Sequence, residues 1–127
     1  MSEKKNRVLV IEDDKDMANA IKMRLEANNF EVLLAENGLE GLEKARTEKP
    51  ELIILDIMLP KMDGFKVCRM LKYDEKFKKV IIIILSAKVQ KSDIEKGKEV
   101  GADAYITKPF KAEELLAKIG ELLKKRS

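Results

Sequence analysis

Short apolar segments recur along the chain in a pattern typical of strands. Three of them, at residues 8–11, 52–55 and 80–85, are nearly unbroken and rich in β-branched residues, as expected for strands covered on both faces of a parallel sheet. Residues 31–34 and 104–107 are weaker candidates. The pattern therefore predicts five strands.

Segments with helical spacing lie between the predicted strands. Residues 15–28 place Met17, Ile21 and Leu25 at intervals of four, and residues 112–124 carry a leucine-rich stripe, so each predicts a helix with one apolar face. Residues 64–73 predict a further helix.

Two pairs of residues have the spacing of a helix N-cap and its partner three positions later. They are Asn37 with Glu40, and Ser92 with Glu95. In such pairs each side chain accepts a hydrogen bond from a free backbone N–H at the helix start. We therefore expect two more helices to begin at these positions.

The resulting order is strand then helix, repeated five times with short connections. Such alternation requires right-handed crossovers and gives an α/β fold with helices on both faces of a parallel sheet. We predict one doubly wound, three-layer domain over residues 1–127, with an ordered core at about residues 6–124.

Composition excludes several chemistries. The 127 residues include no His and one Cys, so the chain cannot supply a Ser-His-Asp or Cys-His nucleophile, an HExxH zinc site or its own phosphohistidine. Cys68 cannot form an intramolecular disulfide, which fits a reducing compartment, and we expect it to be a packing residue.

Net charge and hydropathy limit the classes of partner that we expect this protein to bind. A net charge of +3, spread along the chain, does not argue for nucleic-acid binding. The longest apolar run, residues 80–85, is far shorter than the ~20 residues that span a bilayer. We expect a cytoplasmic protein without a membrane segment.

Polar residues follow four of the predicted strands. Because the carboxyl ends of parallel strands meet at one edge, where ligands bind such sheets, we expect these residues to converge. They are Glu12, Asp13 and Asp14 after the first strand, Asp56 after the third, Ser86 after the fourth, and Lys108 within Thr107-Lys108-Pro109 after the fifth.

The acids among these residues favour a divalent cation. Two carboxylates about 4 Å apart repel by roughly 4 kcal/mol at an effective dielectric constant near 20, so they must share a proton or a cation. Magnesium suits an incomplete cage of carboxylates, and zinc is improbable without His or clustered Cys. Alternatively, Asp13, Asp14 or Asp16 caps the first helix, although three consecutive acids exceed what one cap requires.

The other strand-end residues also have plainer interpretations. Asp56 could be a turn residue before Pro60, in a loop where residues 61–64 predict a turn with positive φ at Gly64. Ser86 could bond an anion or only its own backbone. Lys108 could be a surface lysine, but a cis bond to Pro109 would aim it at the acids.

With these residues in place, the chain resembles the receiver domain of two-component response regulators, the fold of the chemotaxis response regulator. The resemblance covers essentially the whole chain in family order. It rests on Val10-Ile11-Glu12-Asp13-Asp14, residues 54–64, Leu85-Ser86-Ala87, Gly101-Ala102-Asp103-Ala104-Tyr105 and Thr107-Lys108-Pro109-Phe110.

The resemblance implies a flavodoxin-like five-stranded sheet of order 2-1-3-4-5 and a phosphoacceptor signalling domain rather than a conventional enzyme. Asp56 would accept a phosphoryl group from a phosphohistidine in a magnesium-dependent, self-catalysed reaction, with slow autodephosphorylation. The resemblance implies that magnesium is bound by Asp13, Asp56, Glu12 and the Met58 carbonyl, and that Lys108 and Ser86 bind the phosphoryl oxygens. It also implies that Tyr105 is a switch residue and that Met58 and Lys88 tune the phosphoryl lifetime.

The implied partners are a sensor histidine kinase or a histidine phosphotransfer protein, and a downstream target or output domain. The resemblance also allows a phosphorylation-dependent homodimer, and it implies no direct contact with nucleic acid. Because the chain has no His, the phosphoryl donor must be another molecule.

Two alternatives stay open. One is a receiver-like binding module that works without phosphorylation. The other is a flavin or nucleotide protein of the same topology, which is disfavoured because Glu12, Asp13 and Asp14 would repel a phosphate.

Overall fold

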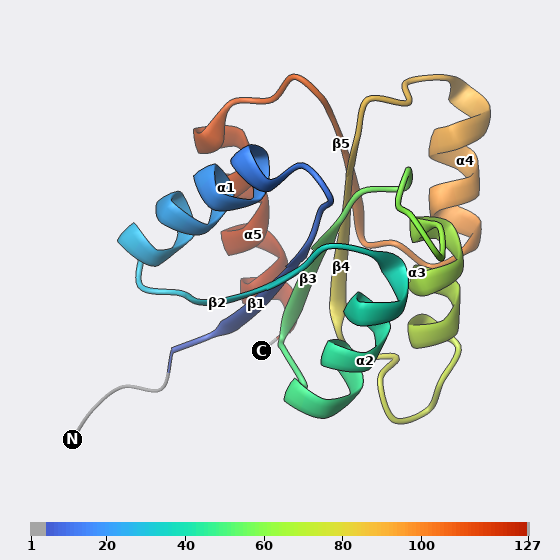
Figure 1. Ribbon diagram of the computed structural model, residues 1–127, viewed down its shortest axis with the longest axis horizontal. Coiled ribbons are helices and arrows are strands. Elements are labelled where there is room, and N and C mark those ends of the chain that lie inside the picture. The colour runs from blue at the N-terminus through green and yellow to red at the C-terminus, as the bar shows by residue number, and fades with distance from the viewer. Residues whose placement is uncertain (1–4, 127) are drawn as a thin grey trace.

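The computed structural model describes residues 5–126, in which five strands alternate with five helices (Figure 1). None of the helices in this range is long and apolar enough to cross a membrane. The elements are β1 (Arg7–Ile11), α1 (Lys15–Ala27), β2 (Glu31–Ala35), α2 (Gly38–Glu48), β3 (Leu52–Leu55), α3 (Gly64–Lys72), β4 (Ile81–Ser86), α4 (Lys91–Glu99), β5 (Ala104–Thr107) and α5 (Ala112–Arg126).

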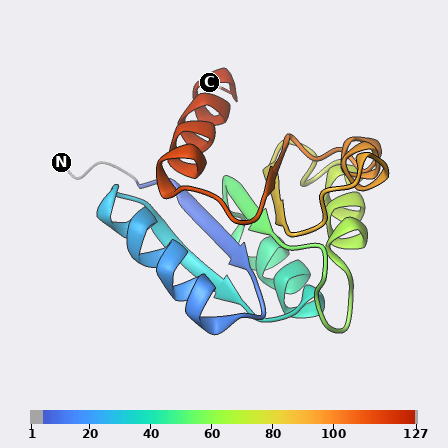
Figure 2. The same cartoon turned by 90° about the horizontal axis from the view of Figure 1, so that it is seen from above.

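The five strands form one parallel sheet in the order β2-β1-β3-β4-β5. Helices α1 and α5 cover one face, and α2, α3 and α4 cover the other (Figures 1 and 2). The predicted doubly wound α/β fold and its strand order are therefore confirmed. The strand and helix bounds differ from the predicted ones by two residues at most.

The central strands are apolar because both of their faces are covered. Successive residues alternate between two cores: Leu9 and Ile53 pack on the side of α2 and α3, whereas Val10 and Ile54 pack on the side of α1 and α5. All four side chains are at most 1% exposed. This double burial explains why the strands read as unbroken apolar runs rather than as alternating patterns.

Three helices begin at capping side chains. The Asp14 carboxylate accepts a hydrogen bond from the Met17 N–H at 3.1 Å, the Asn37 side chain accepts one from the Glu40 N–H at 2.9 Å, and Asp63 caps α3 in the same way. The predicted Asn37 cap is confirmed, but the Glu40 carboxylate accepts from the Glu36 N–H at 2.7 Å rather than from the N–H of Asn37. Since Asp14 serves as the cap of α1, Glu12 and Asp13 are left for other roles.

The predicted cap at Ser92 is wrong. Helix α4 begins at Lys91 after Gln90, which makes no side-chain capping bond, and Ser92 lies inside the first turn. The Gln90 carbonyl instead accepts from the Ile94 N–H at 3.2 Å. A side-chain cap contributes only about 1 kcal/mol, so this helix can begin without one.

The predicted positive φ at Gly64 is also wrong. Gly64 is the first residue of α3, and the left-handed residue of this loop is Lys61, with φ of 68°. A glycine is needed at position 64 for another reason, because a Cβ there would overlap the backbone oxygen of Asp56. The close approach lets α3 start directly beside the end of β3.

Cys68 is a packing residue, as predicted. Its side chain is fully buried in α3, and its thiol donates to the Val100 carbonyl at 3.5 Å. Burial raises the pKa of Cys68 to about 12, so the thiol stays protonated and unreactive at neutral pH.

Candidate functional site

The acidic residues lie where the order of the sheet reverses. From the central pair β1 and β3, the neighbouring strand β2 lies on one side and β4 on the other. The backbone ladder continues one residue past both strands: the Glu12 N–H donates to Ala35 at 3.0 Å, and the Asp56 N–H donates to Ile11 at 3.2 Å. Both acidic residues are thus fixed by the sheet itself.

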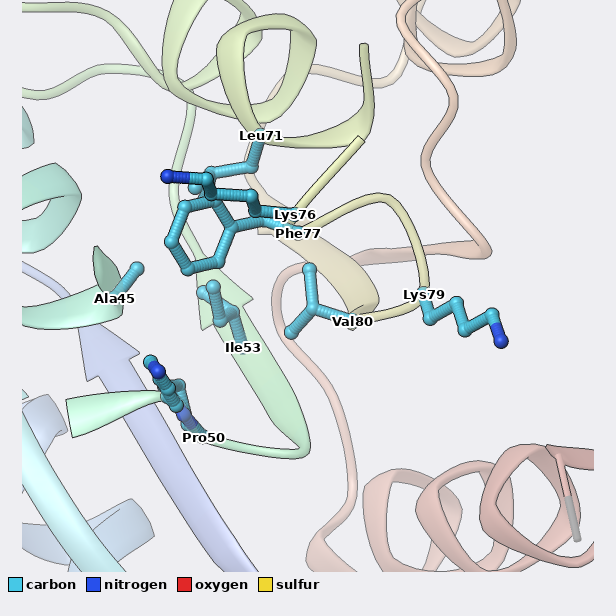
Figure 3. A pocket seen from close by; sticks show the side chains of 9 residues that line it. Ala45, Pro50, Ile53, Leu71, Lys76, Phe77, Lys79 and Val80 are labelled. Carbon is cyan, nitrogen blue, oxygen red and sulfur yellow. The ribbon is translucent and has the colours of Figure 1, made fainter. Parts of the chain in front are cut away.

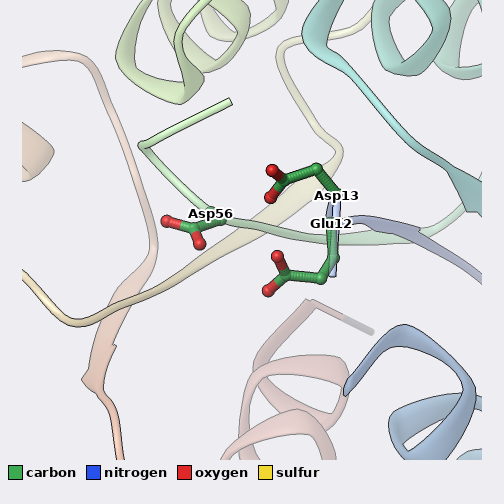
Figure 4. Close-up of side chains that lie close together, drawn as sticks. All are labelled: Glu12, Asp13 and Asp56. Carbon is green, nitrogen blue, oxygen red and sulfur yellow. The ribbon is translucent and has the colours of Figure 1, made fainter. Parts of the chain in front are cut away.

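Three carboxylates form a cluster at this edge, which we call the carboxylate cluster: Glu12, Asp13 and Asp56. One oxygen of each lies within 4.8 Å of the others (Figure 4). Glu12 and Asp56 are only 4% and 9% exposed, whereas Asp13 is exposed. The predicted convergence of residues from separate strands is confirmed for these acids, and their mutual repulsion requires positive charge nearby.

Lys108 supplies one such charge. It follows β5, and its peptide bond to Pro109 is cis, as the sequence suggested. Its Nζ donates to Glu12 Oε1 at 2.8 Å and to Asp56 Oδ2 at 2.9 Å. Lys108 is thus part of the site rather than a surface lysine.

Burial and pairing act against each other on these groups. Burial raises the pKa of Glu12 above its ordinary value, although the hydrogen bond from Lys108 opposes the rise. Burial also works against the charge on Lys108, but its bonds to Glu12 and Asp56 outweigh this and raise its pKa. The lysine therefore stays charged at neutral pH.

The donor set fits magnesium. It consists of oxygens only, and three carboxylates against one lysine leave a formal charge near −2 if all are ionised, which a divalent cation would balance. Both Glu12 oxygens already accept bonds, Oε1 from Lys108 and Oε2 from the Asp14 N–H at 3.2 Å. Asp13 is the most accessible ligand, and Glu12 is better placed to act through water.

Ser86 ends β4, and its backbone carbonyl accepts from the Lys108 N–H at 2.9 Å. Its side chain is fully buried, and its Oγ accepts from the Lys88 N–H at 3.3 Å. The backbone-bonding interpretation of Ser86 is thus observed, while the strand end also holds Ser86 next to Lys108 in the sheet.

Tyr105 of β5 connects to the same loop. Its hydroxyl donates to the Lys88 carbonyl at 2.7 Å, and its half-buried ring lies against Gly97 of α4. Burial, together with the carboxylate of Asp93, raises the pKa of Tyr105. Lys88 therefore contacts both Ser86 and Tyr105 through its backbone.

An open cavity of about 620 Å³ lies beside the cluster. Its lining includes Asp13, Met58 and Lys88, together with Asp93 and Lys96 from α4. The Met58 N–H donates to Asp56 Oδ1 at 3.1 Å, and the Met58 side chain is 61% exposed. Nothing in the sequence distinguishes Asp93 or Lys96 as site residues, because charged residues three apart on a helix are equally typical of a solvated face.

The family comparison agrees with this geometry. A family model described as "Response regulator receiver domain" matches residues 8–120. The chain is 40% identical over 119 residues to the alkaline phosphatase synthesis transcriptional regulatory protein PhoP of Bacillus subtilis, covering 94% of this chain and 49% of PhoP. The chain thus spans about half the length of this relative.

Solved structures are similar as well. A CheY-like receiver domain protein from Methanospirillum hungatei is 30% identical, with a TM-score of 0.91 over 97% of both chains. The BeF3-activated DrrB receiver domain is 31% identical, with a TM-score of 0.87 over 95% of this chain and 99% of that one.

Proposed function

This chain belongs to the response regulator receiver family, and on that premise we propose that Asp56 is the residue that accepts the phosphoryl group. One observation carries the proposal: Lys108 Nζ bridges Glu12 and Asp56 at 2.8 and 2.9 Å, with Asp13 beside them. Asp56 is the member of this group held at the end of the central strand β3.

In the proposed reaction an Asp56 carboxylate oxygen attacks the phosphorus in line with the bond to the donor. A P–O bond forms, the P–N bond of phosphohistidine breaks, and its electron pair goes to the imidazole nitrogen. The product is an acyl phosphate on Asp56. Lys108, already 2.9 Å from Asp56 Oδ2, would neutralise charge on the transferring oxygens, which is the main catalytic requirement of such a reaction.

We assign the magnesium ligands to Asp13, Asp56 and the backbone carbonyl of Met58, with Glu12 acting through water. When bound, magnesium would neutralise the phosphoryl oxygens and bring them to Asp56. The support is the all-oxygen cluster. The Met58 N–H bond to Asp56 also holds the loop close to the acceptor.

The signal is proposed to pass through Ser86, Lys88 and Tyr105. If the Ser86 hydroxyl turned to bond a phosphoryl oxygen, the Lys88 N–H would lose its present acceptor, which is 3.3 Å away. The Lys88 carbonyl holds the Tyr105 hydroxyl, so movement of this loop would reach Tyr105 and α4. Met58 and Lys88, which line the cavity, are assigned the tuning of phosphoryl lifetime by controlling access of water.

The donor histidine must lie outside these 127 residues, because they contain no His. We assign it to a histidine kinase or a histidine phosphotransfer protein. The same proposal places one receiver domain at residues 1–127 and locates it in the cytoplasm. We further propose that it acts on a protein target or output domain without contacting nucleic acid itself, and that phosphorylation leads to a homodimer.

The phosphorylation-independent alternative is not favoured, since the acidic residues and Lys108 are all held together. A flavin or nucleotide function is also not favoured. It would require a phosphate to bind next to Glu12 and Asp13, which lie together in the carboxylate cluster and would repel it.

The test is to incubate the protein with acetyl phosphate and magnesium and to measure its intact mass. We expect the mass of one phosphoryl group to be added, and removed again by hydroxylamine, which cleaves acyl phosphates. Chelating the magnesium should abolish the addition.

Asp56→Asn should block the addition. Asp63→Asn is the matched control, because Asp63 lies in the same loop but caps α3; it should be phosphorylated like the wild type. An unmodified wild-type protein, or an Asp56→Asn variant that is still phosphorylated, would overturn the proposal.

A further inference from the structure

A second recess lies at the opposite edge of the sheet, before the amino ends of β3 and β4. Its volume is about 390 Å³, within the range of small-molecule sites. We call it the lysine-rimmed pocket; it is lined by Ala45, Lys49, Pro50, Ile53, Leu71, Lys76, Phe77, Lys79 and Val80. The functional site at the carboxyl ends of the strands uses none of these residues.

The floor of this pocket is apolar and preformed. Ile53 and Leu71 are fully buried and Val80 is 8% exposed, whereas Phe77 is half-buried. Figure 3 shows the Phe77 ring at the centre, with Ala45 and Val80 beside it. The apolar surface open to a ligand is therefore mainly that of Phe77, with part of Val80, and it offers an aromatic face to a flat apolar group.

The rim is basic. Lys49, Lys76 and Lys79 are exposed, and no acidic side chain is among the described residues that line the pocket. Lys76 extends alongside the Phe77 ring, while Lys79 is directed away from it (Figure 3). Lys76 is thus close enough to act on a bound group, while Lys49 lines the same pocket and Lys79 adds charge nearby.

These lysines differ from neighbouring ones in having no ion-pair partner within the described residues. Nearby Lys72 pairs with Asp103 and Lys78 with Glu75. The acid closest in sequence to Lys49 is Glu48, which pairs with Arg7. Within the described residues, an anion bound at the rim would therefore break no ion pair of these three lysines.

Lys49 also occupies a backbone conformation that does not favour lysine. It ends α2 with φ of 49°, where glycine or asparagine is preferred. A cation at the C-terminus of a helix is favourable by itself, so Lys49 alone would indicate little. Lys49 and Lys76 together form a basic rim above the apolar floor of the pocket.

From this combination we propose that the lysine-rimmed pocket binds a small amphiphilic anion, of the class of aromatic carboxylates. The flat apolar body would lie against Phe77 and Val80, and the carboxylate would face Lys49 and Lys76. A neutral compound would lose the contribution of the rim, and a compact inorganic anion would lose that of the floor.

The test is a titration of the isotopically labelled protein with 1-naphthoate, followed by amide NMR. We expect saturable shifts centred on Ala45, Ile53, Phe77 and Val80. The neutral analogue 1-naphthalenemethanol should bind about tenfold more weakly, as expected from the loss of two exposed charge interactions.

The double variant K49Q/K76Q should weaken naphthoate binding by a similar factor and leave the binding of the alcohol unchanged. K91Q/K98Q removes the same charge from exposed lysines of α4 and should bind naphthoate like the wild type. The proposal would be overturned if binding did not saturate or if the shifts lay elsewhere. It would also be overturned if naphthoate and the alcohol bound equally well, or if K49Q/K76Q bound naphthoate as tightly as the wild type.

Discussion

Helices α3 and α4 each contain nine residues and each follow a strand that ends at the functional site, but they are held very differently. Helix α3 buries Gly64, Phe65, Val67, Cys68 and Leu71. In α4, all of which the structure describes, Gly97 alone is buried.

The ends of the two helices differ as well. At α3, Asp63 caps the start, and the Lys72 Nζ donates to the Val80 carbonyl at 2.8 Å and to Asp103 at 3.1 Å. Helix α4 begins without a side-chain cap. The strand that ends just before Asp56 is therefore followed by a helix with many buried contacts, and the strand that ends at Ser86 is followed by a helix with few.

This difference matches a division of roles between the two strand ends. If Asp56 is the phosphoacceptor, as we propose, it must keep its geometry for in-line attack, and a well-packed α3 beside it serves that need. A responding surface must have two arrangements of similar free energy, and an element with few buried contacts opens at low cost. Under the proposed function, helix α4, which buries Gly97 alone and lies against Tyr105 there, has the few buried contacts that such a surface needs.

The largest contrast is expected from truncating one apolar side chain in each helix. Leu71→Ala removes a fully buried side chain and should lower the free energy of unfolding by about 2–5 kcal/mol. Ile94→Ala acts on a half-buried side chain of α4 and should cost about 1 kcal/mol. Urea unfolding followed by circular dichroism measures both, and equal losses would break the comparison.

The lysine at the end of α3 should matter less than Leu71 but more than a lysine of α4. Lys72→Met leaves the Val80 carbonyl without its lysine donor, which should cost about 1–3 kcal/mol. Lys98→Met, on an exposed position of α4, should change stability by less than about 0.5 kcal/mol. The same urea experiment checks this, and a neutral Lys72→Met would mean that α3 is not anchored by this contact.

The smallest contrast is expected between two glycine substitutions, which test the link between α4 and Tyr105. Gly120→Ala in α5 meets nothing within 4 Å and should stabilise the protein by about 0.5–1 kcal/mol through helix propensity. At Gly97 a Cβ would lie 3.0 Å from Tyr105 Cδ2, so Gly97→Ala should stabilise less and shift the Tyr105 ring signals in NMR spectra. If the two variants were equally stabilised and the Tyr105 ring signals did not shift, the proposed link between α4 and Tyr105 would be contradicted.

Much of the fold could be predicted because local and global signals agree. The run from Leu52 to Leu55 is apolar throughout, since β3 is covered on both faces, and Asp56 follows it directly. Asn37 caps a helix in the way that its sequence spacing indicates. Glu12, Asp13, Asp56 and Lys108 were predicted to meet because parallel strands end at a common edge.

The remainder depends on contacts between distant segments. Ser92 has the spacing of a cap, yet α4, which lies against Tyr105 and Ile84 at Gly97, begins at Lys91 without a side-chain cap. The loop sequence predicts a turn glycine at Gly64, but a glycine is needed there because a Cβ would overlap the backbone oxygen of Asp56. The lysine-rimmed pocket joins Lys49 to Phe77, 28 residues further along the chain, and no local pattern shows this.

The most direct test of the central claim is amide hydrogen exchange of α3 and α4 with and without beryllofluoride and magnesium, which together mimic a phosphoryl group on Asp56. We expect protection to change in α4 and around Tyr105, to stay unchanged in α3, and to be unaffected by the additives in Asp56→Asn. Equal changes in the two helices, or no change in α4 at saturating beryllofluoride, would contradict the account.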